Sequence, residues 1–153
     1  RSCLVGSEMC IRDSHYCFLL EEEGMVFAGD HIMNGSTVVI VPPGGNMKAY
    51  IESLQRLLNY DVTAIAPGHG EVIPGCRDEV EKLVRHRLMR EAKVVANLER
   101  GGPVSIETLV VSVYDDVPEA MHRWAQLSLL AHLLKLEVEG RAHQDAGIWS
   151  LAA

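Results

Sequence analysis

The sequence lacks the cysteine pattern of a disulfide scaffold or of a zinc knuckle. Its four cysteines are Cys3, Cys10, Cys17 and Cys76, and no two of them form a C-x-x-C pair. Small secreted domains need dense, regular cysteine spacing, because their cores are too small to hold them together. We therefore expect free thiols, a reducing compartment and a cytoplasmic location.

Long apolar runs and an excess of basic residues are also missing. No run approaches the ~20 apolar residues of a membrane span, and no secretory signal pattern opens the chain. The chain has 14 Lys and Arg against 21 Asp and Glu, which gives a net charge of -7. This balance argues against duplex DNA as a partner, and we expect no membrane partner either. At 153 residues and 48% apolar content, the chain predicts one domain, or one part-domain with a small module.

Two short apolar runs each end in a polar residue framed by glycine. Residues 25–28 run into Gly29-Asp30-His31, and residues 62–66 run into Pro67-Gly68-His69-Gly70. Runs of this length and composition are typical of buried strands. Taken alone, Asp30 and His69 are each more typical of ordinary turn residues than of a functional site. Together they predict one shared site, since a carboxylate where a buried strand meets a cleft binds a metal or holds a catalytic histidine.

In this order and spacing, the two motifs resemble the last two ligand motifs of the metallo-β-lactamase-fold hydrolases. The resemblance runs from about His15 to the C-terminus. It extends to the branch with an appended C-terminal winged helix, which includes the lactamase-beta-like protein 2 type. It implies an α+β fold, the C-terminal half of an αββα sandwich followed by a winged-helix module. It also implies two zinc ions in the full-length protein, with Asp30 bridging or binding one ion and His69 completing the second site. In that family a metal-bound hydroxide attacks an ester, thioester, amide or phosphodiester.

Most of the ligands that the resemblance requires are not in this chain. The His-x-His-x-Asp-His loop is absent. A further motif, Pro-Gly-His-x-x-x-His, would place His15 at its trailing position and Ile11 in the ligand slot, and isoleucine cannot bind a metal. A two-metal site needs three or four protein groups per ion. We therefore expect this fragment to bind zinc weakly and to be inactive.

Residues 1–14 show neither helical nor strand periodicity, and residues 3–14 resemble translated sequencing-adaptor read-through. We expect residues 1–14 to be non-native; a disordered natural terminus is the alternative. Residues 15–91 are then the C-terminal part of the metallo-β-lactamase domain, and residues 92–153 are the winged-helix-like module.

The remaining patterns predict helices and one more strand. A strand precedes Pro42-Pro43, a helix follows Asn46, and Asp78 with Glu81 forms a capping box for a long helix with an apolar stripe. That stripe comprises Val80, Leu83, Val84, Leu88, Ala92, Val95 and Leu98. A basic cluster on the same helix is either an anionic-substrate patch or, as we favour, a solvated face; it comprises Arg85, His86, Arg87 and Arg90. His31 fits a group near the substrate or metal, or an ordinary loop histidine. Two helices and a β-wing then form the module.

Three classes of function remain open. The first is hydrolysis of a small-molecule ester or thioester, which the acidic surface favours modestly. The second is RNA cleavage, which would make RNA a partner. The third is a non-catalytic interaction protein that uses the winged helix, for which a homo-oligomer is one open arrangement.

Overall fold

The computed structural model describes residues 7–9 and 16–152. The chain divides into two compact units. The first contains the residues up to Val38 together with Lys48–His86, and the second contains Val39–Met47 and the residues from Arg87 onward. The predicted boundary between residues 91 and 92 falls inside a continuous helix, α2 (Cys76–Gly101).

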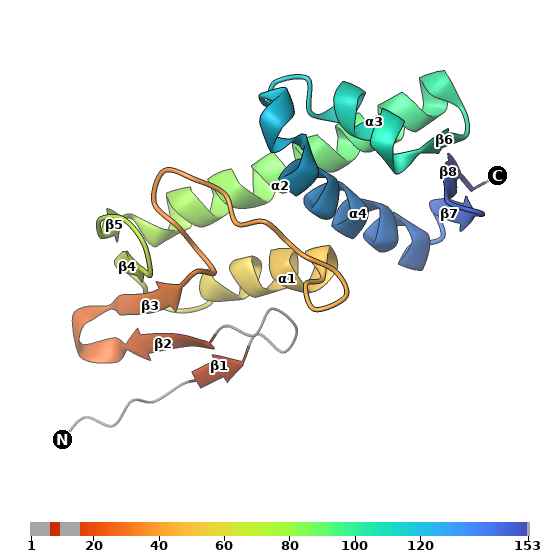
Figure 1. Ribbon diagram of the computed structural model, residues 1–153. Coiled ribbons are helices and arrows are strands. Elements are labelled where there is room, and N and C mark those ends of the chain that lie inside the picture. The colour runs from red at the N-terminus through yellow and green to blue at the C-terminus, as the bar shows by residue number, and fades with distance from the viewer. Residues whose placement is uncertain (1–6, 10–15, 153) are drawn as a thin grey trace. The chain divides into compact units, whose positions relative to one another are not determined.

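The first unit is built on a five-stranded sheet whose order follows the chain. Its strands are β1 (Ser7–Met9), β2 (Tyr16–Leu20), β3 (Met25–Gly29), β4 (Ala64–Pro67) and β5 (Ile73–Pro74). The strands β3 and β4 are parallel, and every other neighbouring pair is antiparallel. Figure 1 shows β2 and β3 side by side. The predicted hairpin is therefore present, with the short helix η1 (Glu21–Glu23) and Gly24 at its tip.

The strand β1 lies within residues 1–14, for which the sequence predicted no strand. Its backbone pairs with β2 from Ser7 opposite Phe18 to Met9 opposite Tyr16. Strand pairing needs only backbone groups, so the alternation of side chains gave no warning of it. Ile11 and His15 lie outside the described residues, as does the rest of the 1–14 segment.

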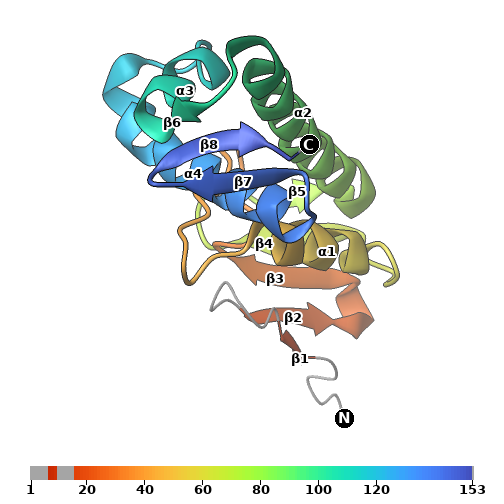
Figure 2. The ribbon, with the colours of Figure 1, turned by 90° about the vertical axis from the view of Figure 1, so that its right-hand side faces the viewer.

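Helix α1 (Met47–Leu57) buries the apolar residues of one of its faces. Met47, Tyr50, Ile51, Leu54 and Leu57 recur at helical spacing, and all five are buried. Four residues of the sheet strands are also buried: Cys17, Val26, Ala28 and Ile65. In Figures 1 and 2, α1 runs alongside β3 and β4. The predicted helix after Asn46 is thus confirmed.

The strand predicted before Pro42 is wrong. Residues 37–41 belong to no helix or strand, and Val39 and Val41 are exposed. Ile40 is buried, and its N–H donates to the Ser128 hydroxyl across 3.3 Å. β-branched residues favour an extended backbone, but a strand also needs a partner strand, and none lies beside this segment among the described residues.

Helix α2 begins at Cys76, two residues before the predicted capping box, so Asp78 lies in the first turn. An acidic residue there still stabilises the positive end of the helix dipole. The predicted apolar stripe is partly wrong. Val80, Leu83 and Leu98 are buried as expected, whereas Leu88 and Ala92 are exposed. The buried face passes instead through Arg87, Arg90, Glu91 and Val94.

The second unit has the helix, helix and wing pattern that the sequence predicts. Its elements are the second part of α2, β6 (Val104–Ser105), α3 (Ile106–Val113), η2 (Glu119–Met121), α4 (His122–Val138), β7 (Ala142–Asp145) and β8 (Ile148–Leu151). Figure 2 shows β7 and β8 as a two-stranded hairpin. Ala146 and Gly147 both have positive φ at its tip, which matches the right-handed twist of a tight hairpin. β6 pairs with β8 to complete a small sheet.

One contiguous core holds the second unit together. It collects apolar residues from α2, α3, α4 and the wing, and Trp149 of β8 is 1% exposed at its centre. Among the described residues, no helix is both long and apolar enough to cross a membrane. The described cysteines, Cys17 and Cys76, are buried free thiols, and burial raises the pKa of Cys76. A raised pKa keeps that thiol protonated and unreactive.

Candidate metal centre

The parallel pair β3 and β4 brings the two glycine-framed motifs to one edge of the sheet. Gly29 and Pro67 are paired at the ends of these strands, so the residues that follow them emerge side by side. Asp30 Oδ1 lies 3.4 Å from His69 Nε2. The structure thus brings together the two residues that the sequence singled out. Their side chains are 46% and 77% exposed, so the pair is open to solvent.

Glycine at two positions lets the second loop approach the first this closely. A Cβ on Gly68 would lie 2.8 Å from Asp30 Oδ1 and 3.0 Å from the backbone of Gly29. A Cβ on Gly70, whose φ is +92°, would lie 2.8 Å from the Cβ of Asn34. Any larger residue would push the loops apart, because rigid backbone stands in the way. The glycines therefore permit the contact between Asp30 and His69.

Hydrogen bonds fasten the same two loops. The Gly68 N–H donates to the Gly29 carbonyl across 2.7 Å, and the Asn34 side-chain amide donates to the Glu71 carbonyl across 3.1 Å. These bonds bracket Asp30 and His69 on both sides. The pair is consequently held by backbone geometry and not by the weak attraction of two exposed groups.

The donor atoms suit a divalent ion such as zinc. A carboxylate oxygen and an imidazole nitrogen are both common zinc ligands, and two ligands at about 2.1 Å from one tetrahedral ion stand roughly 3.4 Å apart. Within the described part of the chain, no group of three or more His, Cys, Asp or Glu residues could hold a metal. The residues present therefore fit two positions of a site. The metal role of Asp30 and His69 stays a prediction.

His31 follows Asp30 directly but turns the other way. It is 3% exposed, and its Nε2 lies 3.0 Å from the Ser53 hydroxyl of α1. The Tyr50 hydroxyl donates to the His31 carbonyl across 3.2 Å. Burial rules out a direct contact between His31 and a substrate in this conformation. Sequence reasoning missed Tyr50 and Ser53; the available signal was a serine placed beside the apolar stripe of α1.

The basic cluster on α2 divides: Arg85 is exposed, as a solvated face predicts, whereas Arg87 and Arg90 are buried. Arg87 and Arg90 are only 3% and 9% exposed. Arg90 donates to both carboxylate oxygens of Asp116, at 2.7 and 2.9 Å, and to the Val113 carbonyl at 2.7 Å. Its guanidinium also lies over the Tyr114 ring. For Arg87 and Arg90, both the substrate patch and the solvated face are wrong, because the core-facing side of α2 passes through these two residues.

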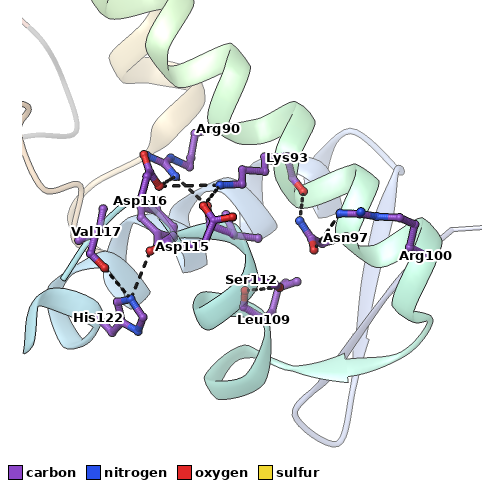
Figure 3. A network of polar contacts seen from close by, with 12 residues as sticks. Arg90, Lys93, Asn97, Arg100, Leu109, Ser112, Asp115, Asp116, Val117 and His122 are labelled. Atoms are coloured by element: carbon purple, nitrogen blue, oxygen red, sulfur yellow. Dashed lines mark hydrogen bonds and ion pairs between the residues drawn. The ribbon is translucent and has the colours of Figure 1, made fainter. Parts of the chain in front are cut away.

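Figure 3 shows further hydrogen bonds and ion pairs in the network around Arg90. Lys93 pairs with Asp115 and Asp116, and His122 Nε2 lies 3.2 and 3.1 Å from the carbonyls of Tyr114 and Val117. The hydrogen bonds from Arg90 lower the pKa of Asp116 and raise that of Arg90, which keeps both charged. The network ties the connection between α3 and α4 to α2, which is a structural role.

Comparisons with known proteins agree with this architecture. Residues 105–149 match the family model described as "Beta-lactamase associated winged helix domain". A "Beta-lactamase-like protein 2 homolog" of Caenorhabditis elegans is 31% identical over 121 residues, which cover 79% of this chain and 39% of that protein. An "Atrochrysone carboxyl ACP thioesterase" of Emericella nidulans is 29% identical over 130 residues, covering 83% of this chain and 41% of the enzyme.

A solved structure shows the same fold. The crystal structure of a metallo-beta-lactamase family protein from Thermus thermophilus superposes with a TM-score of 0.77 at 27% identity. The match covers 91% of this chain and 46% of that one. This chain thus spans about two fifths of the length of the curated relatives named above. The chain belongs to the metallo-β-lactamase-fold proteins that carry a C-terminal winged helix.

Proposed function

We propose that this chain is part of a metal-dependent hydrolase and that Asp30 and His69 supply two of its zinc ligands. The observation that carries the proposal is the 3.4 Å approach of Asp30 Oδ1 to His69 Nε2 at the shared end of two parallel strands. Ligand sites in sheets with parallel strands form at this edge. The family that the chain belongs to supports the same assignment.

The residues of this chain have a limited but definite part in that chemistry. Asp30 contributes negative charge, and His69 contributes a neutral nitrogen lone pair that stays accessible because its side chain is 77% exposed. A bound zinc ion would acidify water and stabilise the negative charge that develops during hydrolysis. Two donors leave most positions around an ion unfilled, so further ligands must come from the rest of a full-length protein.

For the substrate, we propose a small acyl ester or thioester. One relative, 29% identical, is described as an acyl-carrier-protein thioesterase. The net charge of -7 also disfavours a long polyanion such as RNA, whose binding depends on neutralising phosphates. RNA cleavage and a non-catalytic interaction role are the competing outcomes of the test.

The first test uses this chain and zinc alone. We expect the His69 ring signals in NMR spectra to shift on titration with Zn²⁺, with weak, fast-exchanging binding. Asp30→Asn and His69→Ala should each reduce the response, whereas His143→Ala, which removes an exposed histidine of the wing, should not. Tight stoichiometric zinc in the purified chain would contradict the claim that only two ligands are present.

The second test uses a full-length protein that contains this chain. An acyl-thioester and a single-stranded RNA are offered separately, with and without zinc. We expect zinc-dependent hydrolysis of the thioester and its loss in Asp30→Asn and His69→Ala. Hydrolysis of RNA alone would overturn the substrate assignment, and no hydrolysis of either by zinc-loaded protein would favour the interaction role.

A further inference from the structure

The turn after β3 places two neighbouring residues in opposite environments. Asp30 is half exposed at the candidate metal centre, while His31 is 3% exposed in the core and Ile32 is fully buried. A buried histidine has to satisfy its polar nitrogens within the protein. The partners of His31 therefore help to decide where this turn, and with it Asp30, is held.

Two side chains of helix α1 contact His31 through hydrogen bonds. Ser53 Oγ lies 3.0 Å from the ring Nε2, and Tyr50 donates its hydroxyl hydrogen to the His31 carbonyl. The rings of His31 and Tyr50 also meet edge to face, with centroids 5.0 Å apart. The ring and the backbone of His31 are thus both fixed by one turn of α1.

The hydroxyl of Ser53 determines the direction of the bond to the ring. Ser53 donates its single hydrogen to the Tyr50 carbonyl, 2.7 Å away, and so has only lone pairs left for His31. His31 Nε2 must then carry the hydrogen and donate it to Ser53 Oγ. The geometry thus assigns one tautomer to the neutral ring.

The backbone around Asp30 is fixed on both sides as a result. Before it, the Gly29 carbonyl accepts from the Gly68 N–H, and the His31 N–H closes the turn onto the Ala28 carbonyl across 3.0 Å. After it, the His31 carbonyl and ring are held by Tyr50 and Ser53. Asp30 lies between these anchors, facing the loop that carries His69.

We propose that His31 and Ser53 are positioning residues that hold the Asp30 carboxylate beside His69. The link to metal binding rests on the proposed function, whereas the link to loop geometry does not. Groups that orient ligands in this way typically change metal affinity by about 10- to 100-fold when they are removed. α1 would then help to position the site through Tyr50 and Ser53.

The experiment substitutes the brace, meaning His31 and Ser53, and leaves both ligands intact. Ser53→Ala removes the acceptor, Ser53→Thr restores it, and His31→Phe keeps an aromatic ring without the nitrogen. The matched control is Ser112→Ala. Ser112 also donates to the carbonyl three residues before it, at 3.1 Å, and has no histidine partner among the described residues. Amides of the β3–β4 pairing report whether the first unit of each variant is folded.

Three measurements are made on this chain. The first is hydrogen exchange of the Gly68 amide, which reports the contact between the two loops without metal. The second is the tautomer of His31 by ¹⁵N-detected NMR. The third is the Zn²⁺ affinity from the His69 ring signals. We expect Ser53→Ala and His31→Phe to speed Gly68 exchange about 10-fold and to weaken Zn²⁺ binding by about 10-fold or more. Ser53→Thr and Ser112→Ala should match the unsubstituted chain.

Each contrary result has a distinct meaning. Unchanged Gly68 exchange and zinc affinity in the folded Ser53→Ala and His31→Phe variants overturns the positioning role. Faster exchange with unchanged zinc affinity overturns it as well, because the brace would then hold the turn but not the ligand. An Nδ1–H tautomer overturns the assigned bond. If Asp30→Asn and His69→Ala themselves leave the zinc response unchanged, the proposed function fails, and Gly68 exchange still tests the brace.

Discussion

The two units of the chain differ in whether their paired charged groups are exposed or buried. In the first, the paired groups Asp30 and His69 stay in solvent. In the second, Glu91 is 5% exposed and pairs with Lys135 at 2.8 Å and with Arg141 at 3.2 Å. Exposed pairs contribute little to stability, whereas a buried charge is costly unless its partners remain. The pair in the first unit is therefore accessible to a ligand, whereas the pairs of Glu91 contribute to the structure of the second unit.

Their apolar surfaces differ in the same direction. The second unit closes a core around Trp149, with side chains from α2, α3, α4 and β8. The first leaves a row of aromatic residues on one face of its sheet, with Phe18 opposite Phe27 and stacked on Tyr16. One unit is therefore complete within the described residues, and the other presents a sheet face that no described residue covers fully.

The largest expected effect comes from the core of the complete unit. Trp149→Ala should lower the free energy of unfolding of the second unit by about 3–5 kcal/mol, because it removes a large buried ring and leaves a cavity. Trp124→Ala is the matched control; Trp124 is 54% exposed, and its loss should change stability by less than about 0.5 kcal/mol. Segment-resolved hydrogen exchange measures each unit separately, and equal losses in both units would break the comparison.

The next effect comes from the buried carboxylate. Glu91→Gln should destabilise the second unit by about 3 kcal/mol at neutral pH, since Lys135 and Arg141 would lose their buried partner and keep only the more exposed Glu139. Glu137→Gln, on the exposed side of α4, is the control and should have little effect. Urea unfolding followed at Trp149 gives both values, and an unchanged midpoint for Glu91→Gln would show that the network contributes nothing.

Acid should act through the same carboxylate. Burial alone would raise the pKa of Glu91, but the neighbouring His132 ring, 3.6 Å away, and the hydrogen bond from Lys135 outweigh it and lower the pKa from 4.5 to about 2. The folded state thus binds the proton less tightly than the unfolded state. The stabilisation is present above pH 4.5 and is lost as pH falls toward 2, on the order of 3 kcal/mol in total.

His132 should begin this loss at higher pH. It is fully buried beside Glu91, Arg87 and Lys135, and burial lowers its pKa below 6.5. Its neutral form is favoured in the folded state, so stability starts to fall as pH drops below 6.5. Unfolding midpoints between about pH 7 and pH 2 measure both parts. Glu91→Gln should remove the part below 4.5, and an identical acid profile in that variant would contradict the assignment.

These results also show how far the sequence could lead. Asp30 and His69 were found because each ends a recognisable strand, and parallel neighbours place such ends together. The winged-helix pattern was likewise readable, since each helix and strand has its own periodicity and turn residues. The local sequence pattern was sufficient to predict these elements, because each helix or strand is encoded by its own residues.

The buried arginines and Ser53 were beyond the sequence for a different reason. Arg90 can be buried because it donates a hydrogen bond to Asp116, 26 residues later. Glu91 can be buried because it accepts one from Lys135, 44 residues later. Nothing in the local pattern of α2 encodes these partners. Ser53 is similar: a single serine on an apolar stripe acquires a role only when His31, 22 residues earlier, is placed against it. Long-range contacts between polar groups require the fold.

The smallest effect on folding, and the sharpest test of the open sheet face, comes from its aromatic residues. Phe18 and Phe27 are 41% and 45% exposed and face each other across β2 and β3. Replacing both with serine should change the stability of the first unit by only about 1 kcal/mol, because much of each ring is already in water.

Exposed apolar faces of this kind promote association, so the unsubstituted chain should aggregate as concentration rises. Light scattering after size exclusion should show less association in the double variant. Val138→Ser, which removes a 77% exposed residue of the second unit, should leave association unchanged. If Val138→Ser were equally effective, or if the unsubstituted chain were monodisperse, the contrast would fail, because the sticky surface would not be specific to the unit whose sheet is uncovered.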